Sequence, residues 1–485
     1  MLCISITEKT TERIIEAINS DSYGDLYEIR YDLAEKADLK RIISSVKTQK
    51  PLLITNRRKS EGGNFSGSES ERISILETAI RLRADYIDIE FSSGKQAIQM
   101  LKALAKKTSA KTKIILSYHN FKETPENIDE IYSKMKKEDC DIIKIVTYAN
   151  SINDNLKIFN LLQQKKNLIA FCMGEIGQLS RIFCNMKGSF MTYASISDGK
   201  ESASGQITAK TLKDIYKIDS LNRKTKIYGL VGNPVSESKG YLIHNKCFQK
   251  LGLDNVYVNF LVDDVDDFFS GYKEFFSGLS VTMPHKQVVM KYLDDIDESA
   301  KKINAVNTIE VKNGKLIGHN TDVYGAIQSI KDKTTIKGKN CLMLGAGGVA
   351  RAIAYGVLTE GGKLFVSDSD ENKARGFADE FKCKYIPISE IKKINCEVLI
   401  NATPIGMFPN VNSCVVEENF LKKDMVVFDV VYNPAETKLI RMAKKKGCKV
   451  VYGLDMFIYQ AVKQFELWTG KKAPIEVMRK IISIE

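Results

Sequence analysis

Two sets of residues, each centred on a lysine, have the side chains that carbonyl chemistry requires. The first set pairs Lys144 with His119. A buried lysine with a neutral amine forms an imine with a ketone, the neighbouring C–H becomes acidic, and a histidine moves that proton. The second set pairs Lys286 with Asp322, ahead of a glycine loop that begins at Gly345. A lysine tuned by a carboxylate can supply or accept the proton that accompanies hydride transfer. Two such sets on one chain predict consecutive steps on one substrate.

Eight short apolar runs, rich in β-branched residues, must position the first set. Polar helical patterns such as Glu71–Arg83 and Ser93–Lys106 lie between them, and eight β/α units of this size predict a closed parallel (β/α)8 TIM barrel. The runs are Leu2–Ile6, Leu26–Arg30, Pro51–Thr55, Tyr86–Phe91, Lys113–Tyr118, Ile142–Thr147, Asn167–Met173 and Ser189–Ala194. Such a barrel carries its chemistry at the C-terminal strand ends, where polar residues gather in this sequence. They are Ser5, Glu28, Arg30, Arg57, His119 and Lys144.

The second half of the chain predicts a two-lobed α/β unit after a short polar connector, residues 216–225. A first lobe begins with the strand Lys226–Val231, and the strand Asn340–Leu344 leads into the glycine loop and a helix from about Val349. This order is typical of a doubly wound Rossmann nucleotide-binding domain. Its further strands are predicted at Lys363–Ser367, Val398–Asn401 and Val426–Val430. Two closing helices, Met456–Thr469 and Ile475–Ile482, are expected to pack back across both lobes.

Composition excludes several classes of protein. The 485 residues predict two or three domains, and 44% hydrophobic with 27% charged residues is typical of a soluble globular chain. No run approaches the roughly 18–20 apolar residues of a membrane span, and the N-terminus enters a strand pattern at once, without a leader. The ten cysteines form no C-x-x-C pair and are expected to be reduced, in the cytoplasm. The net charge of +12 comes from scattered lysines, which favour anionic small molecules over nucleic acid or membrane as partners.

Each feature also has a plainer interpretation. A lone histidine at a strand end is more often structural, and a strand lysine often extends its charged end to solvent. A lysine–carboxylate pair is often a surface ion pair, and a glycine loop can be a tight turn without a ligand. Only the combination of these features favours catalysis.

The first 215 or so residues resemble type I 3-dehydroquinate dehydratase. The matching segments are Glu28-Ile-Arg-Tyr-Asp, Arg57 with Glu61-Gly-Gly, Ser117-Tyr-His-Asn-Phe, Ile143-Lys-Ile, Met173-Gly through Ser180-Arg181, and Ser202-Ala-Ser-Gly-Gln206. The resemblance implies that Lys144 forms the Schiff base and that His119, beside Glu61, is the general acid and base. It assigns the substrate's hydroxyls and carboxylate to Ser5, Glu28, Arg30, Arg57, Arg181, Ser202 and Gln206. Ser204 stands where the family commonly has proline, which is expected to loosen an open lid.

Residues from about 226 to 485 resemble shikimate dehydrogenase. The matching segments are Gly232-Asn-Pro with Ser238 and His244-Asn, Val281-Thr-Met-Pro-His-Lys286, Ala305-Val-Asn-Thr, Asn320-Thr-Asp322, Gly345-Ala-Gly-Gly, Asn401-Ala-Thr-Pro, Asp429-Val-Val-Tyr432 and Gly453 through Gln460. The resemblance makes Lys286 and Asp322 the catalytic pair. It implies shikimate contacts from Ser238, Thr282, Asn307, Tyr432 and Gln460. The expected cofactor contacts come from Gly345, Ala346, Gly347, Gly348, Val349, Asp368, Asn401, Thr403, Val430 and Gly453.

Two departures from the dehydrogenase pattern affect specificity. The family usually has a second serine and then proline, where this chain has Gly240 and Tyr241. One hydroxyl donor to the substrate carboxylate is therefore missing, which is expected either to weaken binding or to shift specificity toward a relative of shikimate such as quinate. The family default is NADP, but its usual Asn-Arg-Thr clamp is replaced by Ser367-Asp-Ser. A carboxylate at Asp368 binds ribose hydroxyls, repels a 2′-phosphate and therefore favours NAD.

The resemblance as a whole implies a bifunctional shikimate-pathway enzyme, without a metal. Its substrates are 3-dehydroquinate, 3-dehydroshikimate and shikimate. The predicted domains are a barrel at 1–217, a substrate-binding lobe at 226–328 completed by helices at 456–485, and a Rossmann domain at 329–455. Two alternatives stay open, an NAD-dependent quinate/shikimate dehydrogenase in the second half and a non-catalytic metabolite-sensing module.

Overall fold

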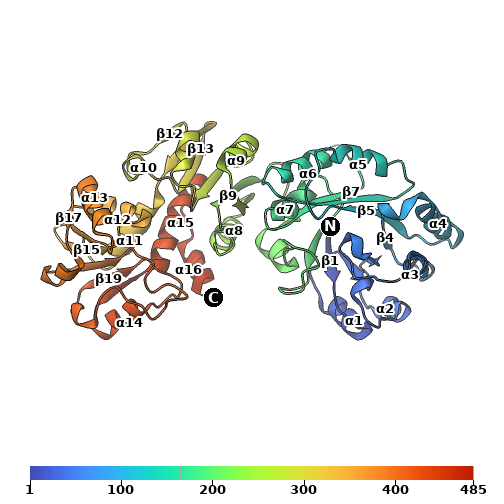
Figure 1. Ribbon diagram of the computed structural model, residues 1–485, viewed down its shortest axis with the longest axis horizontal. Helices are drawn as coiled ribbons and strands as arrows, with labels where there is room; N and C mark the ends of the chain where they lie inside the picture. Colours follow the sequence, from blue (N-terminus) through green and yellow to red (C-terminus); the bar gives the residue numbers. More distant parts are fainter. Residues whose placement is uncertain (164, 484–485) are drawn as a thin grey trace. The chain divides into compact units, whose positions relative to one another are not determined.

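The computed structural model describes residues 1–163 and 165–483, which fall into two compact units. Unit 1 consists of Met1–Ile227, Asn233–Ser236 and Asp254–Phe275. Unit 2 consists of Tyr228–Gly232, Glu237–Leu253 and Phe276–Glu485. Figure 1 shows the chain coloured by sequence, with many of its helices and strands labelled.

Unit 1 is built on eight parallel strands, as predicted. They are β1 (Leu2–Ile6), β2 (Leu26–Arg30), β3 (Leu52–Thr55), β4 (Tyr86–Glu90), β5 (Lys113–His119), β6 (Ile142–Tyr148), β7 (Leu168–Met173) and β8 (Thr192–Ser195). They pair in the order β7-β6-β5-β4-β3-β2-β1-β8. A backbone hydrogen bond from Phe190 N to Leu168 O, 2.8 Å long, joins the approach to β8 with the start of β7. The result is a nearly closed TIM barrel.

Seven helices surround the barrel strands (Figure 1). They are α1 (Thr11–Ser20), α2 (Leu39–Ser45), α3 (Glu69–Arg81), α4 (Gly94–Lys107), α5 (Ile128–Met135), α6 (Asp154–Leu162) and α7 (Gln178–Lys187). Helix α3 begins at a capping box, in which Ser68 and Glu71 satisfy each other's backbone N–H groups. Strand β1 is buried along its whole length, because its alternate side chains face the barrel interior and the helices. The predicted strand at Ser189–Ala194 starts three residues too early, since Ser189 turns back to Met191 O before β8 begins.

A buried ion pair fixes α3 to β4. Arg72 of α3 and Glu90 of β4 are each only 1% exposed, and their side chains approach to 2.5 Å. Arg72 also donates to Ser93 Oγ at 2.6 Å and to the backbone oxygen of Asn56 at 3.2 Å. These bonds satisfy a guanidinium that would otherwise be costly to bury.

Unit 1 also contains β10 (Asn255–Leu261) and α9 (Val265–Tyr272). The hydroxyl of Tyr272 donates to Ile152 O at 2.8 Å, and the ring of Phe275 stacks on Phe159 at 5.9 Å. This segment therefore packs on the barrel beside α6.

Two six-stranded sheets make up the rest of the fold. The first runs β10-β9-β11-β13-β14-β12 and combines parallel and antiparallel pairs. Its other strands are β9 (Lys226–Gly232), β11 (Gly278–Val281), β12 (Asp295–Ile296), β13 (Thr308–Lys312) and β14 (Lys315–His319). The second sheet is the predicted Rossmann sheet, with the parallel order β17-β16-β15-β18-β19-β20. Its strands are β15 (Asn340–Leu344), β16 (Lys363–Ser367), β17 (Lys384–Tyr385), β18 (Val398–Asn401), β19 (Val426–Asp429) and β20 (Lys449–Tyr452).

Two helices of unit 2, α11 (Thr321–Lys331) and α15 (Gly453–Thr469), connect its substrate-lobe strands with its Rossmann sheet. The two helices pack against each other, and α15 contacts both β13 and β20. Helix α15 therefore contacts both lobes, as expected, whereas α16 (Ile475–Ser483) packs on α8 (Gly240–Lys250) and α15. The remaining helices are α10 (Glu298–Ile303), α12 (Gly348–Thr359), α13 (Glu371–Phe381) and α14 (Lys438–Lys445).

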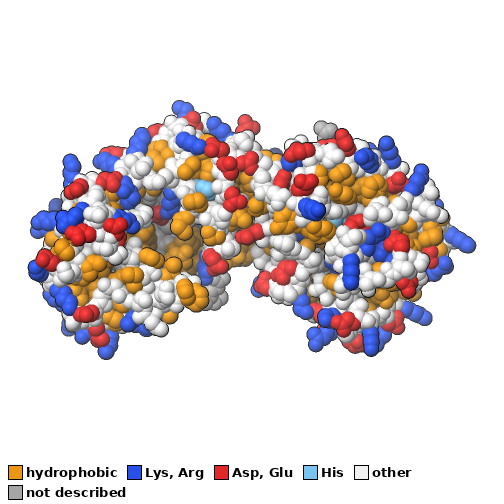
Figure 2. Space-filling model, in the orientation of Figure 1, with side chains coloured by type: hydrophobic (Ala, Val, Ile, Leu, Met, Phe, Trp, Pro, Cys, Tyr) orange, Lys and Arg blue, Asp and Glu red, His pale blue; other side chains and the backbone are white. Residues whose placement is uncertain are grey.

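Surface and cysteine chemistry agree with the compositional interpretation. On the face shown in Figure 2, Lys and Arg side chains are interspersed with Asp and Glu. All ten cysteines are free thiols. In the part of the chain that the structure describes, no helix is both long and apolar enough to span a bilayer.

We expect Arg72→Met to lower the free energy of unfolding of the barrel by about 3–5 kcal/mol, because it leaves Glu90 buried without its partner. Arg41→Met is the matched control, since Arg41 pairs with Glu12 while both are more than half exposed. The control should leave the unfolding midpoint unchanged. Chemical denaturation followed by circular dichroism measures both variants, and equal midpoints would contradict the role given to the buried pair.

Two candidate active sites

All ten barrel residues named from the sequence line a single cavity. They are Ser5, Glu28, Arg30, Arg57, Glu61, His119, Lys144, Arg181, Ser202 and Gln206. Gly62, Phe121, Val146, Phe171, Met173, Tyr193 and Ala203 complete its lining. Residues from strands far apart in sequence meet here, because the C-terminal ends of parallel strands converge at one mouth of the barrel.

Lys144 is 4% exposed and stands within a ring of charged and aromatic groups. Its Nζ lies 3.2 Å from Asp88 Oδ2, 3.7 Å from Glu28 Oε1 and 4.2 Å from the centre of the Tyr193 ring. The chemistry expected from the sequence requires a buried lysine. The burial is present, but the direct ion-pair partners of this lysine are carboxylates.

Asp88, which contacts both Lys144 and Arg57, was not identified from the sequence as a residue of this site. Asp88 Oδ2 lies 2.9 Å from Arg57, and its Oδ1 accepts from Ser117 Oγ at 2.6 Å. Burial alone would raise the pKa of Asp88, but the positive charges of Arg57 and Lys144 outweigh it and hold this pKa well below its usual range. The only signal in the sequence was the pair of carboxylates in Tyr86-Ile-Asp-Ile-Glu, two residues apart inside an apolar run.

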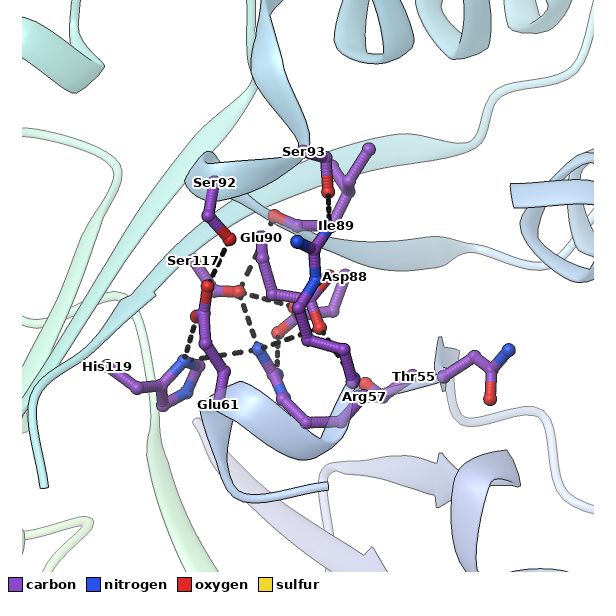
Figure 3. A network of polar contacts seen from close by, with 12 residues as sticks. Thr55, Arg57, Glu61, Asp88, Ile89, Glu90, Ser92, Ser93, Ser117 and His119 are labelled. Carbon is purple, nitrogen blue, oxygen red and sulfur yellow. Dashed lines mark hydrogen bonds and ion pairs between the residues drawn. The ribbon is translucent and has the colours of Figure 1, made fainter. Parts of the chain in front are cut away.

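His119 lies between a cation and a carboxyl group. Its Nδ1 is 3.2 Å from Arg57 and 3.3 Å from Glu61 Oε2, and Figure 3 shows Arg57 between His119 and Asp88. Burial, together with the charges of Arg57 and Lys144, lowers the pKa of His119 well below its ordinary value. Burial also raises the pKa of Glu61, against the hydrogen bond it accepts from Ser92. The imidazole is therefore neutral near pH 7 and able to accept a proton.

Arg181 is a buried cation without a carboxylate among the described residues. It is 1% exposed and lies over the ring of Phe171 at 4.6 Å. Its Nε is buried without a hydrogen-bond partner in the part of the chain described, and burial lowers its pKa to about 10. Because burying an unpaired charge is costly, this arrangement favours an anionic ligand in the cavity.

The remaining barrel residues hold one another in place around the cavity. Ser5 donates to Glu28 at 2.8 Å, and Arg30 forms a two-pronged contact with Asp32. Gln206 Oε1 accepts from the backbone N of Ser202 at 2.7 Å, which orders the segment after β8. Within this segment the backbone oxygen of Ser204 accepts from Gly174 N.

The second site contains a close lysine–carboxylate pair. Lys286 Nζ lies 2.6 Å from Asp322 Oδ2, and Asp322 stands in the first turn of α11, whose N-cap is Asn320. Asn307 is 3% exposed, and its Oδ1 accepts from the backbone N of Thr321 at 2.7 Å. The backbone N of Val306 donates to Lys286 O, so the lysine, Asn307 and the start of α11 form one cluster.

Other predicted substrate residues lie on neighbouring elements of this unit. The backbone N of Thr282 donates to Val231 O at the end of β9, and Ser238 precedes α8. Gln460 packs on Gly325 of α11, one helical turn beyond Asp322. Tyr432 is 48% exposed and stacks with Phe457 at 6.0 Å, which places it beside α15 rather than in direct contact with the lysine pair.

The glycine loop has the geometry of a phosphate-binding turn. Gly345 has φ +108°, a conformation that glycine adopts without strain, and α12 starts directly after Gly347. A Cβ added at Gly347 or Gly348 would meet nothing within 4 Å, so the backbone faces open space. Asp368 follows β16, and its Oδ2 accepts from the backbone N of Ala346 at 2.8 Å. The loop thus fits a dinucleotide, with a carboxylate at its edge.

Several of the predicted cofactor residues make contacts that shape the loops near the glycine turn. Asn401 is fully buried and donates to Ile405 O and Asp429, while its oxygen accepts from Thr403. Its side chain therefore shapes the loop after β18. Val430 N donates to Asn401 O, and Gly453 approaches so closely that an added Cβ would lie 2.4 Å from Val430 O. Val349 lies in the first turn of α12.

Comparison with known families divides the chain at the same places. Residues 2–223 match type I 3-dehydroquinase, residues 230–309 the shikimate dehydrogenase substrate-binding domain, and residues 453–482 the shikimate 5'-dehydrogenase C-terminal domain. Residues 341–432 match a family described as NADP oxidoreductase coenzyme F420-dependent.

Individual relatives agree with these matches. A shikimate dehydrogenase (NADP(+)) of Pyrococcus abyssi is 42% identical over 53% of this chain and 97% of its own. The structure of quinate dehydrogenase from Corynebacterium glutamicum in complex with NAD aligns with 54% of this chain and 99% of its own, with a TM-score of 0.51 and 30% identity. The chloroplastic bifunctional 3-dehydroquinate dehydratase/shikimate dehydrogenase of Arabidopsis thaliana is 36% identical over 100% of this chain and 84% of its own. The chain therefore belongs to the family of bifunctional 3-dehydroquinate dehydratase/shikimate dehydrogenases.

Proposed function

We propose that the barrel dehydrates 3-dehydroquinate to 3-dehydroshikimate through an imine at Lys144. One observation carries this proposal. The same cavity contains a buried lysine, a neutral histidine and, in Arg181, a buried cation without a carboxylate partner among the described residues. An imine-forming amine beside a base and an anion site is what a hydroxylated keto acid requires.

The roles of the individual residues follow from their positions. Lys144 attacks the ketone, and His119 takes the proton from the adjacent carbon and returns it to the departing hydroxyl, with Glu61 beside the ring. Arg181 holds the substrate carboxylate. The substrate's hydroxyls are assigned to Ser5, Glu28, Arg30, Arg57, Ser202 and Gln206, which surround the same cavity.

The C-terminal half then reduces 3-dehydroshikimate to shikimate. A nicotinamide cofactor, when bound at the glycine loop, supplies the hydride. Lys286, held 2.6 Å from Asp322, delivers the proton to the ketone oxygen, and the carboxylate keeps the ammonium in place. Shikimate is held by Ser238, Thr282, Asn307, Tyr432 and Gln460, and the cofactor by Gly345–Val349, Asp368, Asn401, Thr403, Val430 and Gly453.

The cofactor we propose is NAD. Asp368 places a carboxylate at the edge of the glycine loop, and its pKa is lowered because backbone N–H donors outweigh its burial. The charge stays in place near pH 7 and repels a ribose 2′-phosphate. Lys373, 3.9 Å away, is the one cation that contacts this carboxylate among the residues described.

A quinate/shikimate dehydrogenase that works with NAD in the oxidative direction is the second candidate. Gly240, buried at the start of α8, stands where the family usually has a serine hydroxyl. Rates of oxidation of shikimate and quinate, measured side by side, separate the two candidates. A higher kcat/KM for quinate would favour the second.

The proposal also includes the domain plan and the cellular setting. The barrel corresponds to residues 1–217, the substrate lobe to 226–328 with 456–485, and the Rossmann domain to 329–455. Ten free thiols are in keeping with a cytoplasmic enzyme that acts on small molecules rather than on nucleic acid or membrane.

We expect borohydride to trap a covalent adduct on Lys144 when 3-dehydroquinate is present. Reduction of the imine makes the link permanent, so peptide mass spectrometry locates it. Lys113→Ala, which alters the exposed first residue of β5, should leave the adduct yield unchanged, whereas Lys144→Ala should abolish it. Absence of an adduct from the wild-type chain would instead support a non-catalytic sensor.

We expect His119, His244 and His319 to titrate over different pH ranges. Despite partial burial, the hydrogen bonds that the His319 ring donates to Asp297 and Glu310 raise its pKa, so this ring should still be largely protonated at pH 6.5. The pKa of His119 and that of His244 are lowered by burial, the latter to about 3, so both rings should stay neutral at pH 6. Nitrogen-15 NMR of labelled histidine, with His119→Asn for assignment, measures this. A His119 resonance that titrates near pH 6.5 would contradict its role as a neutral base.

We expect NAD to support shikimate oxidation with a kcat/KM at least about tenfold above that of NADP, roughly 1.4 kcal/mol. The double variant Asp368→Asn with Ser369→Arg removes the repelling carboxylate and adds a cation, so it should reverse the preference. A coupled assay that starts from 3-dehydroquinate, run with each reduced cofactor, tests both halves together. A strong NADP preference of the wild-type chain would disprove the argument from Asp368.

A further inference from the structure

Asp88 is the carboxylate nearest to the reacting nitrogen of the barrel. It lies on β4, its side chain is fully buried, and its Oδ2 is 3.2 Å from Lys144 Nζ and 2.9 Å from Arg57. Its Oδ1 accepts from Ser117 Oγ at 2.6 Å, and Figure 3 shows Ser117 and Arg57 converging on it. Both oxygens therefore have donors, and the carboxylate is held in one orientation.

The other groups around Lys144 are less suited to pair with its charge. Glu28 is 3.7 Å away, and its two oxygens already accept from Ser5 at 2.8 Å and Thr55 at 2.9 Å. The ring of Tyr193 faces the nitrogen at 4.2 Å. The remaining titratable groups that line the cavity are Arg30, Arg57, Glu61, His119 and Arg181. Asp88 is the anion in direct contact.

The chemistry of imine formation keeps the charge on this nitrogen. The ammonium first gives up one proton, and the neutral amine then attacks the ketone, so that overall a C–N bond forms and the C–O bond breaks. Two hydrogens leave with the oxygen as water, and the nitrogen keeps one hydrogen and the positive charge. A fixed anion beside the nitrogen therefore stabilises both the starting ammonium and the iminium. Only a protonated imine withdraws electrons strongly enough to acidify the neighbouring carbon.

We propose that Asp88 is a catalytic residue of the barrel, the counter-ion that holds the Lys144 nitrogen in the cavity and keeps the imine protonated. This role rests on the imine mechanism proposed above. Because Oδ2 is shared with Arg57, the anion does not fully cancel the electron-withdrawing charge of the iminium. His119, the neutral base, is then left to move the substrate proton.

The pKa shifts of Asp88 and His119 agree with these two roles. Burial would raise the pKa of Asp88, yet Arg57 and Lys144 hold it well below its usual range, so the carboxylate remains charged at working pH. A permanently charged group does not exchange protons and acts through its field. The pKa of His119 is lowered in the same cavity, which leaves that ring available as the acceptor.

The experiment compares Asp88→Asn and Glu90→Gln in the full-length chain. Glu90 is two residues further along β4, equally buried, and pairs with Arg57 at 3.8 Å and with Arg72, but has no contact with Lys144. We expect Asp88→Asn to lower kcat for dehydration by about 100-fold. The alkaline limb of its pH–rate profile should move to lower pH by at least about one unit, because an unpaired iminium loses its proton more easily. Glu90→Gln should leave the alkaline limb in place.

Two further measurements distinguish a loss of catalysis from a loss of folding. Shikimate oxidation by the same chains should be unchanged, which reports the amount of folded C-terminal half. If Asp88→Asn does not fold, Ser117→Ala, which removes a donor to Asp88, should shift the limb in the same direction by less.

Three results would overturn the assignment. An unshifted alkaline limb in the folded Asp88→Asn variant, or failing that in Ser117→Ala, would overturn it while leaving the imine intact. An equal shift of the alkaline limb in Glu90→Gln would show that Asp88 has no role distinct from that of other buried charges. Absence of a borohydride adduct from the wild-type chain would overturn the imine mechanism and this role with it.

Discussion

The barrel depends on the balance of charge inside its mouth. Lys144, Arg57 and Arg72 are buried cations, and each has a carboxylate within about ion-pair distance, Asp88 for the first two and Glu90 for the third. Such pairs stabilise a fold only when every partner is present, because removal of one leaves a charge in a poorly solvating interior. The same constraint that holds α3 against β4 therefore also fixes the lysine and the histidine to which we assign the chemistry.

Arg181 is not part of these ion pairs. It lies in the same cavity with an aromatic ring beneath it and without a carboxylate among the described residues. The other buried cations of the cavity are paired with carboxylates and stabilise the fold. Arg181 is not, so its charge is available to a ligand. In unit 2, the Lys286–Asp322 pair is instead partly exposed, and the hydrogen bonds at the start of α11 hold it in place.

Much of the fold could be predicted because a parallel strand that is buried on both faces appears in the sequence as a continuous apolar run. Strands β1, β2, β15, β16 and β18 have the bounds that their apolar runs predicted, since both faces of each strand are covered. Strand β8 was placed too early, because Ser189 and Phe190 look like strand residues but form a turn. Asp88 was missed since a carboxylate inside an apolar run has no local feature that reveals its partners on β3 and β6.

The sequence by itself determined the two families, the lysines that we propose as catalytic and ten of the residues that line the barrel cavity, because spaced motifs carry that information along the chain. Only the tertiary structure decided which charges meet. It placed Asp88 against Lys144, left Arg181 without a carboxylate, and put Asp368 on the backbone of the glycine loop. The reason is physical: the strength of an ion pair depends on separation and burial, and both are set by strands and helices that lie far apart in sequence.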